Sequence, residues 1–214
     1  MLIIGPRVPR RGNTFSRGLG RLVLFLLGWK LAGEIPDQPR MVLIGAPHTS
    51  NMDGVIGLVT LTALGLRAGT MIKQSAFHGP LGWLLRWMGA IPVDRATARG
   101  VVEQTVDAFR ATPALLLLVA PEGTRKSAGE WKRGFHHIAR GAGVPILPAA
   151  ADYQRRVITF GPLLWPQADV EADLAQLVRF YNEQGQGRHP ERLSRPLCEA
   201  RGLPWRPHPA DPAD

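Results

Sequence analysis

The chain has 214 residues, 45% of them hydrophobic, which can bury one substantial core and favours a single domain. The only cysteine, Cys198, excludes an intramolecular disulfide framework and a cysteine-based zinc cluster. The formal net charge of +9 indicates anionic partners: phosphorylated substrates, acidic phospholipids or nucleic acid.

The N-terminal segment, residues 1–33, predicts a loose basic arm over 1–16 followed by an apolar helix. The apolar run over 22–31 follows two arginines, contains Trp29 and is shorter than the roughly 20 residues needed to span a bilayer. Such a run is typical of an amphipathic, membrane-associating helix that lies among the headgroups of anionic lipids. An ordinary core helix and a secretory signal are the alternatives.

Apolar strands alternate with amphipathic helices over residues 34–184. Strands are expected at 41–45, 70–72, 91–93, 115–119, 144–148 and 157–160, and helices at 54–64, 80–88, 101–109, 131–141 and 170–181. The pattern predicts an α/β fold with a mostly parallel or mixed central sheet covered by helices. The helix over 80–88 is apolar nearly all round and is expected either in the core or against lipid. Residues 185–214, rich in Pro, Arg and Gly, are expected to wrap the surface as a tail.

His48 and Asp53 follow the strand over 41–45 and are the first candidates for catalysis. Five residues correspond to about 140° around a helix, so the two side chains can meet only if His48 lies on the loop before the helix. Ser50 or Asn51 then caps the helix, and Asp53 in its first turn can bond one imidazole nitrogen while the other accepts a proton. The alternative is structural, because Ser50 and Asp53 also have the spacing of a capping box.

A second motif, Pro-Glu-Gly-Thr-Arg over 121–125, follows another predicted strand. Gly123 permits close backbone approach, and Thr124 and Arg125 offer contacts to an anion, while Glu122 can orient the guanidinium. An ordinary turn with a surface ion pair is the alternative.

Two further cations, Lys73 and Arg95, each follow a predicted strand. Positions of this kind commonly converge on one ligand crevice in a wound sheet, although either residue could equally be a solvated surface charge. The adjacent His136 and His137 point in different directions on a helix and have no nearby set of ligands, so no metal site is predicted.

Taken in order, these motifs resemble the four sequence blocks of the glycerolipid acyltransferases, and more narrowly those of bacterial 1-acylglycerol-3-phosphate (lysophosphatidate) acyltransferases. The blocks lie at 48–53, 89–95, 121–125 and 144–148, and the resemblance covers about residues 40–165. Two positions depart from the family pattern, because Ala120 replaces a usual Phe and Pro92 replaces a larger apolar residue. Both put the acyl-chain or acceptor preference in doubt.

The resemblance implies a direct transfer of an acyl group from acyl-coenzyme A or acyl carrier protein to a lysophospholipid hydroxyl, with no other cofactor. It implies that His48 is the general base, that Asp53 orients it, and that 34–184 is the acyltransferase domain. Backbone amides near the start of the helix after His48 are the candidates to stabilise the oxyanion. The residues implied around the acceptor phosphate are Arg95, Glu122, Gly123 and Arg125.

The first expectation for the acceptor is lysophosphatidate, and for location the cytoplasmic face of the inner membrane, with peripheral or monotopic attachment to an anionic surface. Another lysolipid or glycerol-3-phosphate is the alternative acceptor. Outside the enzyme class, the alternative is a non-catalytic lipid-binding membrane protein. Nucleic acid is not an expected partner, because the chain has no aromatic-rich basic recognition motif.

Overall fold

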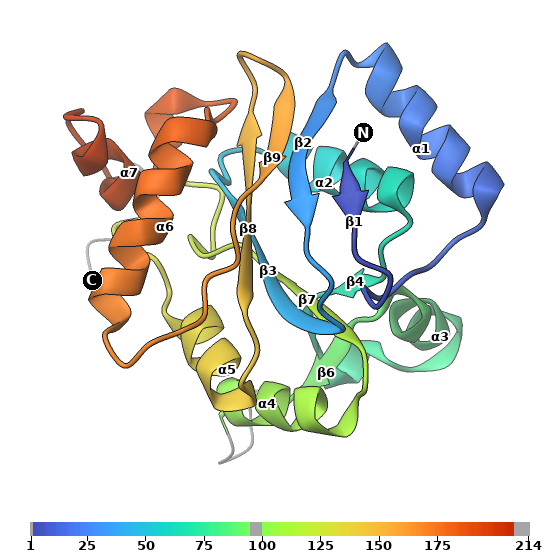
Figure 1. The fold of residues 1–214 in the computed structure, drawn as a ribbon. Helices are drawn as coiled ribbons and strands as arrows, with labels where there is room; N and C mark the ends of the chain where they lie inside the picture. Colours follow the sequence, from blue (N-terminus) through green and yellow to red (C-terminus); the bar gives the residue numbers. More distant parts are fainter. Residues whose placement is uncertain (1, 95–99, 208–214) are drawn as a thin grey trace.

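The computed structural model describes residues 2–94 and 100–207, whose core is a seven-stranded sheet of order β1-β2-β9-β8-β3-β7-β4 (Figure 1). All neighbouring strands of this sheet are parallel except β8 and β9, which run antiparallel. Strands β5 and β6 form a separate parallel pair. The strands are β1 Ile3–Ile4, β2 Lys30–Ile35, β3 Arg40–Ala46, β4 Ala68–Gly69, β5 Met71–Lys73, β6 Ile91–Val93, β7 Leu115–Val119, β8 Ile146–Asp152 and β9 Val157–Phe160.

Helices cover both faces of the sheet, as the predicted α/β class requires (Figure 1). Successive residues of β3 point to opposite faces. Met41 and Leu43 belong to the apolar cluster that contains residues of α1 and α2, whereas Val42 and Ile44 belong to the cluster with α4, α5 and α6. The helices are α1 Thr14–Leu26, α2 Asn51–Leu64, α3 Gly79–Met88, α4 Val101–Ala111, α5 Gly134–Ala142, α6 Val170–Gln184 and α7 Arg195–Ala200, with short 3-10 turns at Gln74–Ala76 and Pro190–Arg192.

The N-terminal segment differs from its prediction. The loose arm is wrong: β1 pairs with β2, and Val8 is buried. The helix predicted to extend to residue 31 ends at Leu26, because Gly28 adopts the left-handed conformation and Lys30 begins a strand that pairs with β9. Pairing with a strand far along the chain therefore overrides the local apolar pattern. No helix within 2–94 and 100–207 is long and apolar enough to cross a bilayer.

The C-terminal segment contributes to the core as well as to the surface. Leu193, Leu197 and Cys198 are buried in the cluster that underlies α6, and α7 packs beside that helix. Gln186 forms a bridge with Asp152 at the end of β8. The expectation of a surface tail is thus wrong for this part of the segment, since residues that look isolated in the sequence complete an apolar cluster. The division of the chain at 33 and 184 stays a prediction.

Candidate active site

His48 lies on the loop between β3 and α2, as its spacing from Asp53 predicts. Ser50 is the N-cap of α2, and its hydroxyl accepts a hydrogen bond from the Met52 N–H at 3.2 Å. Asp53 Oδ2 accepts hydrogen bonds from the N–H groups of Thr49 at 2.7 Å and Ser50 at 2.8 Å. The capping box and the candidate catalytic pair are therefore built from the same residues, because the bonds that begin the helix also fix the carboxylate.

The Asp53 carboxylate links the histidine to a residue that the sequence reasoning missed. Its Oδ2 lies 3.5 Å from His48 Nδ1, and its Oδ1 accepts a hydrogen bond of 2.6 Å from the Tyr153 hydroxyl. Burial opposes ionisation of Asp53, but hydrogen bonds from His48, Tyr153 and the two backbone N–H groups outweigh it and hold the pKa below the usual value. The carboxylate is thus kept charged beside the imidazole, which stabilises a protonated His48.

Glu122 is hydrogen-bonded to the backbone of the histidine loop, residues 47–50 between β3 and α2. Its side chain is buried, and its Oε2 accepts a hydrogen bond from the His48 backbone N–H, while Oε1 has no hydrogen-bond partner within the described chain. Burial raises the pKa of Glu122 to about 7, an effect that bonds from His48 and Ser194 partly offset. The expectation that Glu122 orients Arg125 is wrong, because the carboxylate points inward to the histidine loop.

Three buried residues outside the sequence motifs form a chain of contacts that begins at Ser194, whose side chain hydrogen-bonds Glu122. The Trp131 indole N–H donates to the Ser194 hydroxyl at 2.9 Å, and the Trp131 ring packs edge-on against Tyr181. The Tyr181 hydroxyl in turn donates to the Ile44 carbonyl of β3 at 2.8 Å. This buried chain of contacts connects the C-terminal segment to the strand that leads to His48.

The turn over 121–125 brings cations close to the start of α2. The Arg125 guanidinium donates to the Asn51 side-chain oxygen, which places it beside the histidine loop. Gly123 adopts a left-handed conformation, and a Cβ there would lie 2.8 Å from Lys132 Cε, so the lysine side chain crosses directly over the glycine. The Thr124 hydroxyl accepts from the Lys126 N–H at 3.2 Å. The turn therefore presents Arg125 and Lys132 where an anionic group could bind.

The other two predicted cations are not placed with these residues. Lys73 is exposed at the end of β5, in the two-stranded sheet, and does not line either of the cavities described below. Arg95 lies outside the described residues. Their contribution to a substrate site stays a prediction.

An apolar cavity of about 410 Å³ opens beside His48 and Asp53. His48 and Asp53 line one part of it, and the rest lies between α2 and the sheet, with Ala120, just before the 121–125 turn, in its wall. Gly54 and Gly57 also line it, and a Cβ at either position would meet nothing within 4 Å. A long apolar chain could lie along α2 with its reacting end at His48.

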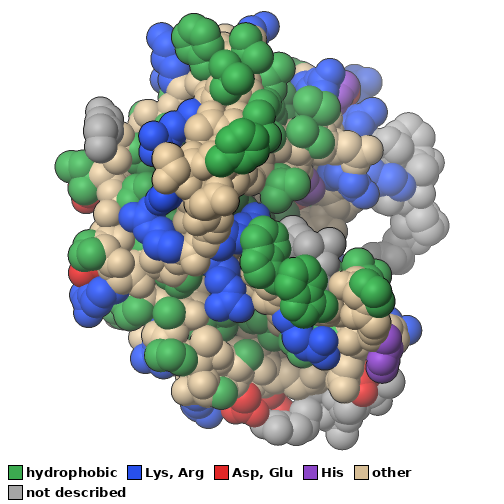
Figure 2. Space-filling view, turned by 90° about the vertical axis from the view of Figure 1, so that its right-hand side faces the viewer, with side chains coloured by type: hydrophobic (Ala, Val, Ile, Leu, Met, Phe, Trp, Pro, Cys, Tyr) green, Lys and Arg blue, Asp and Glu red, His purple; other side chains and the backbone are tan. Residues whose placement is uncertain are grey.

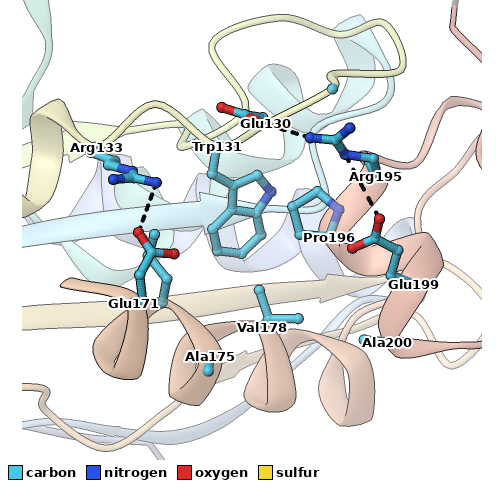
Figure 3. A pocket seen from close by; sticks show the side chains of 12 residues that line it. Glu130, Trp131, Arg133, Glu171, Ala175, Val178, Arg195, Pro196, Glu199 and Ala200 are labelled. Carbon is cyan, nitrogen blue, oxygen red and sulfur yellow. Dashed lines mark hydrogen bonds and ion pairs between the residues drawn. The ribbon is translucent and has the colours of Figure 1, made fainter. Parts of the chain in front are cut away.

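A second cavity, of about 450 Å³, lies between α6, α7 and the loop around Trp131 (Figure 3). Its charged side chains pair with one another: Arg133 with Glu171 at 2.7 Å, and Arg195 with Glu130 at 3.0 Å (Figure 3). No histidine of the described chain lines it, and its carboxylates are engaged by arginines, so the cavity beside His48 is the candidate active site.

The two adjacent histidines of α5 have a structural explanation. His136 is fully buried, and its Nε2 lies 2.7 Å from Asp173 Oδ2, so it forms a core ion pair or hydrogen bond with α6. Within the described parts of the chain, no three side chains of His, Cys, Asp or Glu are grouped to hold a metal ion.

Glu122 makes folding stability depend on pH. The pKa of Glu122 is higher in the folded chain than its ordinary value of 4.5, so the folded state holds this proton more tightly than the unfolded chain does. The contribution of Glu122 to folding stability is therefore greatest below pH 4.5 and is lost as the pH rises toward 7. We expect Glu122→Gln to gain stability relative to the unmodified protein as pH rises, by up to about 1.4 kcal/mol per pH unit. Urea unfolding of both proteins at several pH values measures the difference, and a constant difference would contradict the raised pKa.

The chain is similar to known proteins in sequence. The model of the acyltransferase family matches residues 31–152. The 1-acyl-sn-glycerol-3-phosphate acyltransferase of Escherichia coli (strain K12) is 30% identical over 157 residues, which is 68% of this chain and 62% of that protein. The protein of the same name from Streptococcus pneumoniae is 28% identical over 145 residues, 63% of this chain and 52% of that protein. The chain thus spans about half to three fifths of these curated relatives.

A solved structure has the same fold. The 1-acyl-sn-glycerophosphate (LPA) acyltransferase PlsC of Thermotoga maritima superposes with a TM-score of 0.57, covering 79% of this chain and 78% of that chain. Sequence identity between the two is 16%. The likeness supports the α/β architecture and the mostly parallel sheet described above.

Proposed function

The chain belongs to the acyltransferase family, and from this premise we propose that it transfers a fatty acyl group from an acyl thioester to the hydroxyl of a lysophospholipid. The observation that carries the proposal is the pairing of His48 with a buried, ionised Asp53 at the edge of an apolar cavity. One part of this site is suited to moving a proton and the other to holding an acyl chain.

The geometry favours His48 as general base. Nδ1 faces Asp53, so Nε2 is free to take the proton of the acceptor hydroxyl while its oxygen attacks the thioester carbonyl carbon. Collapse of the tetrahedral intermediate breaks the carbon–sulfur bond, and the leaving thiolate takes the proton back from the imidazolium. Acyl-coenzyme A and acyl carrier protein are both suitable donors, and the step needs no metal ion or other cofactor.

Most of the backbone amides predicted as oxyanion donors at the start of α2 are already engaged. The N–H groups of Thr49 and Ser50 donate to Asp53, that of Met52 donates to Ser50, and that of His48 donates to Glu122. These amides hold the loop in shape, which leaves the Asn51 N–H at the start of α2 and the Arg125 guanidinium beside it as the candidate donors for the oxyanion.

For the acceptor, we propose lysophosphatidate, because the curated relatives carry that activity in their names and because Arg125 and Lys132 can bind a phosphate beside His48. Purified protein offered acyl-coenzyme A with lysophosphatidate, another lysolipid or glycerol-3-phosphate, while free thiol is followed, tests the choice. Thiol release with lysophosphatidate is the expected result. Binding to lipid vesicles without thiol release from any acceptor would favour a non-catalytic lipid-binding protein.

We also propose that the protein lies on an anionic membrane, at the cytoplasmic face of the inner membrane, through α1 and α3. Figure 2 shows hydrophobic and basic side chains gathered on the face that carries these helices. The apolar side chains that this face exposes are long or aromatic and include Phe15, Leu22 and Phe25 of α1 and Leu81, Trp83 and Trp87 of α3. An apolar surface of this extent beside arginines fits a lipid interface.

The double substitution Phe15→Ser and Phe25→Ser tests this surface. Both rings are more than three-quarters exposed, so their loss should leave the fold intact and weaken binding to anionic vesicles by at least about tenfold, since burying each ring in lipid is worth about 1.5–3 kcal/mol. Vesicle sedimentation measures the change. Leu203→Ser, after α7 on the far side of the molecule from α1, is the control and should bind like the unmodified protein (Figure 1). Equal binding by all three proteins would exclude α1 as the anchor.

A further inference from the structure

The cavity beside His48 contains an arginine whose side chain has no hydrogen-bond acceptor among the described residues. Arg11 lines its wall, and Nη1 of Arg11 is fully buried. Its guanidinium makes no hydrogen bond or ion pair with any described residue and instead lies over the Trp87 ring, 5.2 Å from the ring centroid. The arginine as a whole is only partly buried, but a buried guanidinium nitrogen without a hydrogen-bond acceptor is costly and calls for an explanation.

A second unpaired polar atom lines the same cavity. Thr60 of α2 is 3% exposed, and its Oγ1 has no hydrogen-bond partner among the described residues, although a helical threonine can usually bond a carbonyl one turn back. Thr60 follows Asp53 by seven residues, which is about two turns and roughly 10 Å along the helix axis. The Arg11 backbone N–H donates to the carbonyl of Gly65, the C-cap of α2, so both groups lie toward the end of the helix that is remote from His48 and Asp53.

This end of the cavity is positively charged and reaches the surface. Burial and the neighbouring charge of Arg67 both lower the pKa of Arg11, and the Arg67 guanidinium donates to the Arg86 carbonyl, an uncharged acceptor. The lining residues Leu58 and Thr70 are exposed, so the cavity opens to solvent. Trp87, against which Arg11 packs, belongs to the apolar face of α1 and α3 seen in Figure 2.

We propose that Arg11 and Thr60 form a second anion site, which binds the phosphate group of a phospholipid where the cavity opens toward the apolar face. Arg11 donates to the phosphate oxygens, and the Thr60 hydroxyl bonds an oxygen of the same headgroup. Phosphate fits better than a carboxylate, because its greater charge offsets the repulsion between Arg11 and Arg67. The surrounding apolar surface favours a phosphate that carries acyl chains over a free phosphate ion.

The site is separate from the His48–Asp53 pair and from the turn over 121–125, so its test does not depend on acyl transfer. A binding measurement answers it even if the protein turns over no acceptor. Monomeric dihexanoyl phosphatidate is the lipid probe, inorganic phosphate is the probe for the free ion, and isothermal titration calorimetry of the full chain measures both.

Arg11→Met removes the charge and keeps a side chain that can pack on Trp87. We expect it to weaken binding of dihexanoyl phosphatidate by at least about tenfold, the effect of one charge-assisted hydrogen bond, and Thr60→Val to weaken it by about two- to tenfold. Arg179→Met removes an equal charge from an exposed position of α6, outside the cavity and outside the proposed membrane face, and should bind like the unmodified protein. Without ligand, Arg11→Met should unfold at the same or a higher temperature, because it relieves an unpaired cation.

Several results would overturn the proposal. They are unchanged binding by Arg11→Met, an equal loss in Arg179→Met, and a lowered unfolding temperature of ligand-free Arg11→Met, which would make the arginine structural. Inorganic phosphate binding as tightly as the lipid would exclude a headgroup site. If Arg11→Met does not fold, Arg11→Lys keeps the charge but loses the bidentate donor, and it should bind the lipid more weakly than the unmodified protein while Thr60→Val shows its own loss.

Discussion

Replacing His48 with alanine is expected to lower the rate of thiol release by about 10²- to 10⁴-fold or more, because the general base is lost. The imidazole is 26% exposed and its side chain contacts Asp53 at 3.5 Å, so its removal leaves the backbone bonds of the loop in place. The His48 N–H would still donate to Glu122, and Asp53 would still cap α2. Activity should therefore fall without a comparable loss of folding stability.

The control for this prediction is His137→Ala. His137 is exposed on α5 and lines neither cavity, so the change removes a histidine without touching the candidate site. Both variants are compared by thermal unfolding and by thiol release with acyl-coenzyme A and lysophosphatidate. Near-normal turnover by folded His48→Ala would reject the general-base assignment and leave the acyltransferase fold without its proposed chemistry.

The catalytic loop could be predicted from the sequence because its determinants are local. Apolar runs mark β3 and β7, and the short polar spacing from Ser50 to Asp53 defines the start of α2. Only a loop position lets His48 face Asp53, and the structure places it there. Boundaries set by long-range pairing were less accessible, as the early end of α1 before β2 shows.

The support of the site was missed because it comes from distant parts of the chain. Tyr153 is 100 residues from the Asp53 carboxylate that it bonds, and Ser194 reaches Glu122 only because the C-terminal segment packs into the core. Tyr153 directly follows the observed strand β8, the kind of position used to nominate Lys73 and Arg95, but the strand predicted from the sequence covered only 144–148 and so did not point to it. For Glu122, charge alone suggested a partner for Arg125, whereas burial directs it to the histidine loop.

Filling the cavity through Gly57→Leu should separate acyl-chain binding from catalysis. Gly57 lies inside α2 and lines the cavity, and a Cβ there meets nothing within 4 Å, so a leucine can extend into the space proposed for the acyl chain. Turnover of long-chain donors should fall by at least about tenfold, because a difference of one methylene group in a hydrophobic pocket can already change the preference between two substrates by that factor. Short-chain donors should retain activity, because the substitution leaves His48 and Asp53 unchanged.

The same substitution should make the protein more stable, which distinguishes a filled pocket from a damaged fold. A glycine inside a helix costs about 0.8–1 kcal/mol relative to better helix formers, so Gly57→Leu should raise the free energy of unfolding while it lowers long-chain activity. Gly18→Leu in α1 is the matched control: it also replaces a helical glycine with open space around its Cβ, but it lies outside the cavity and should keep the chain-length profile. If Gly57→Leu slows short and long donors equally, the acyl chain does not lie along α2, and the apolar cavity serves another ligand.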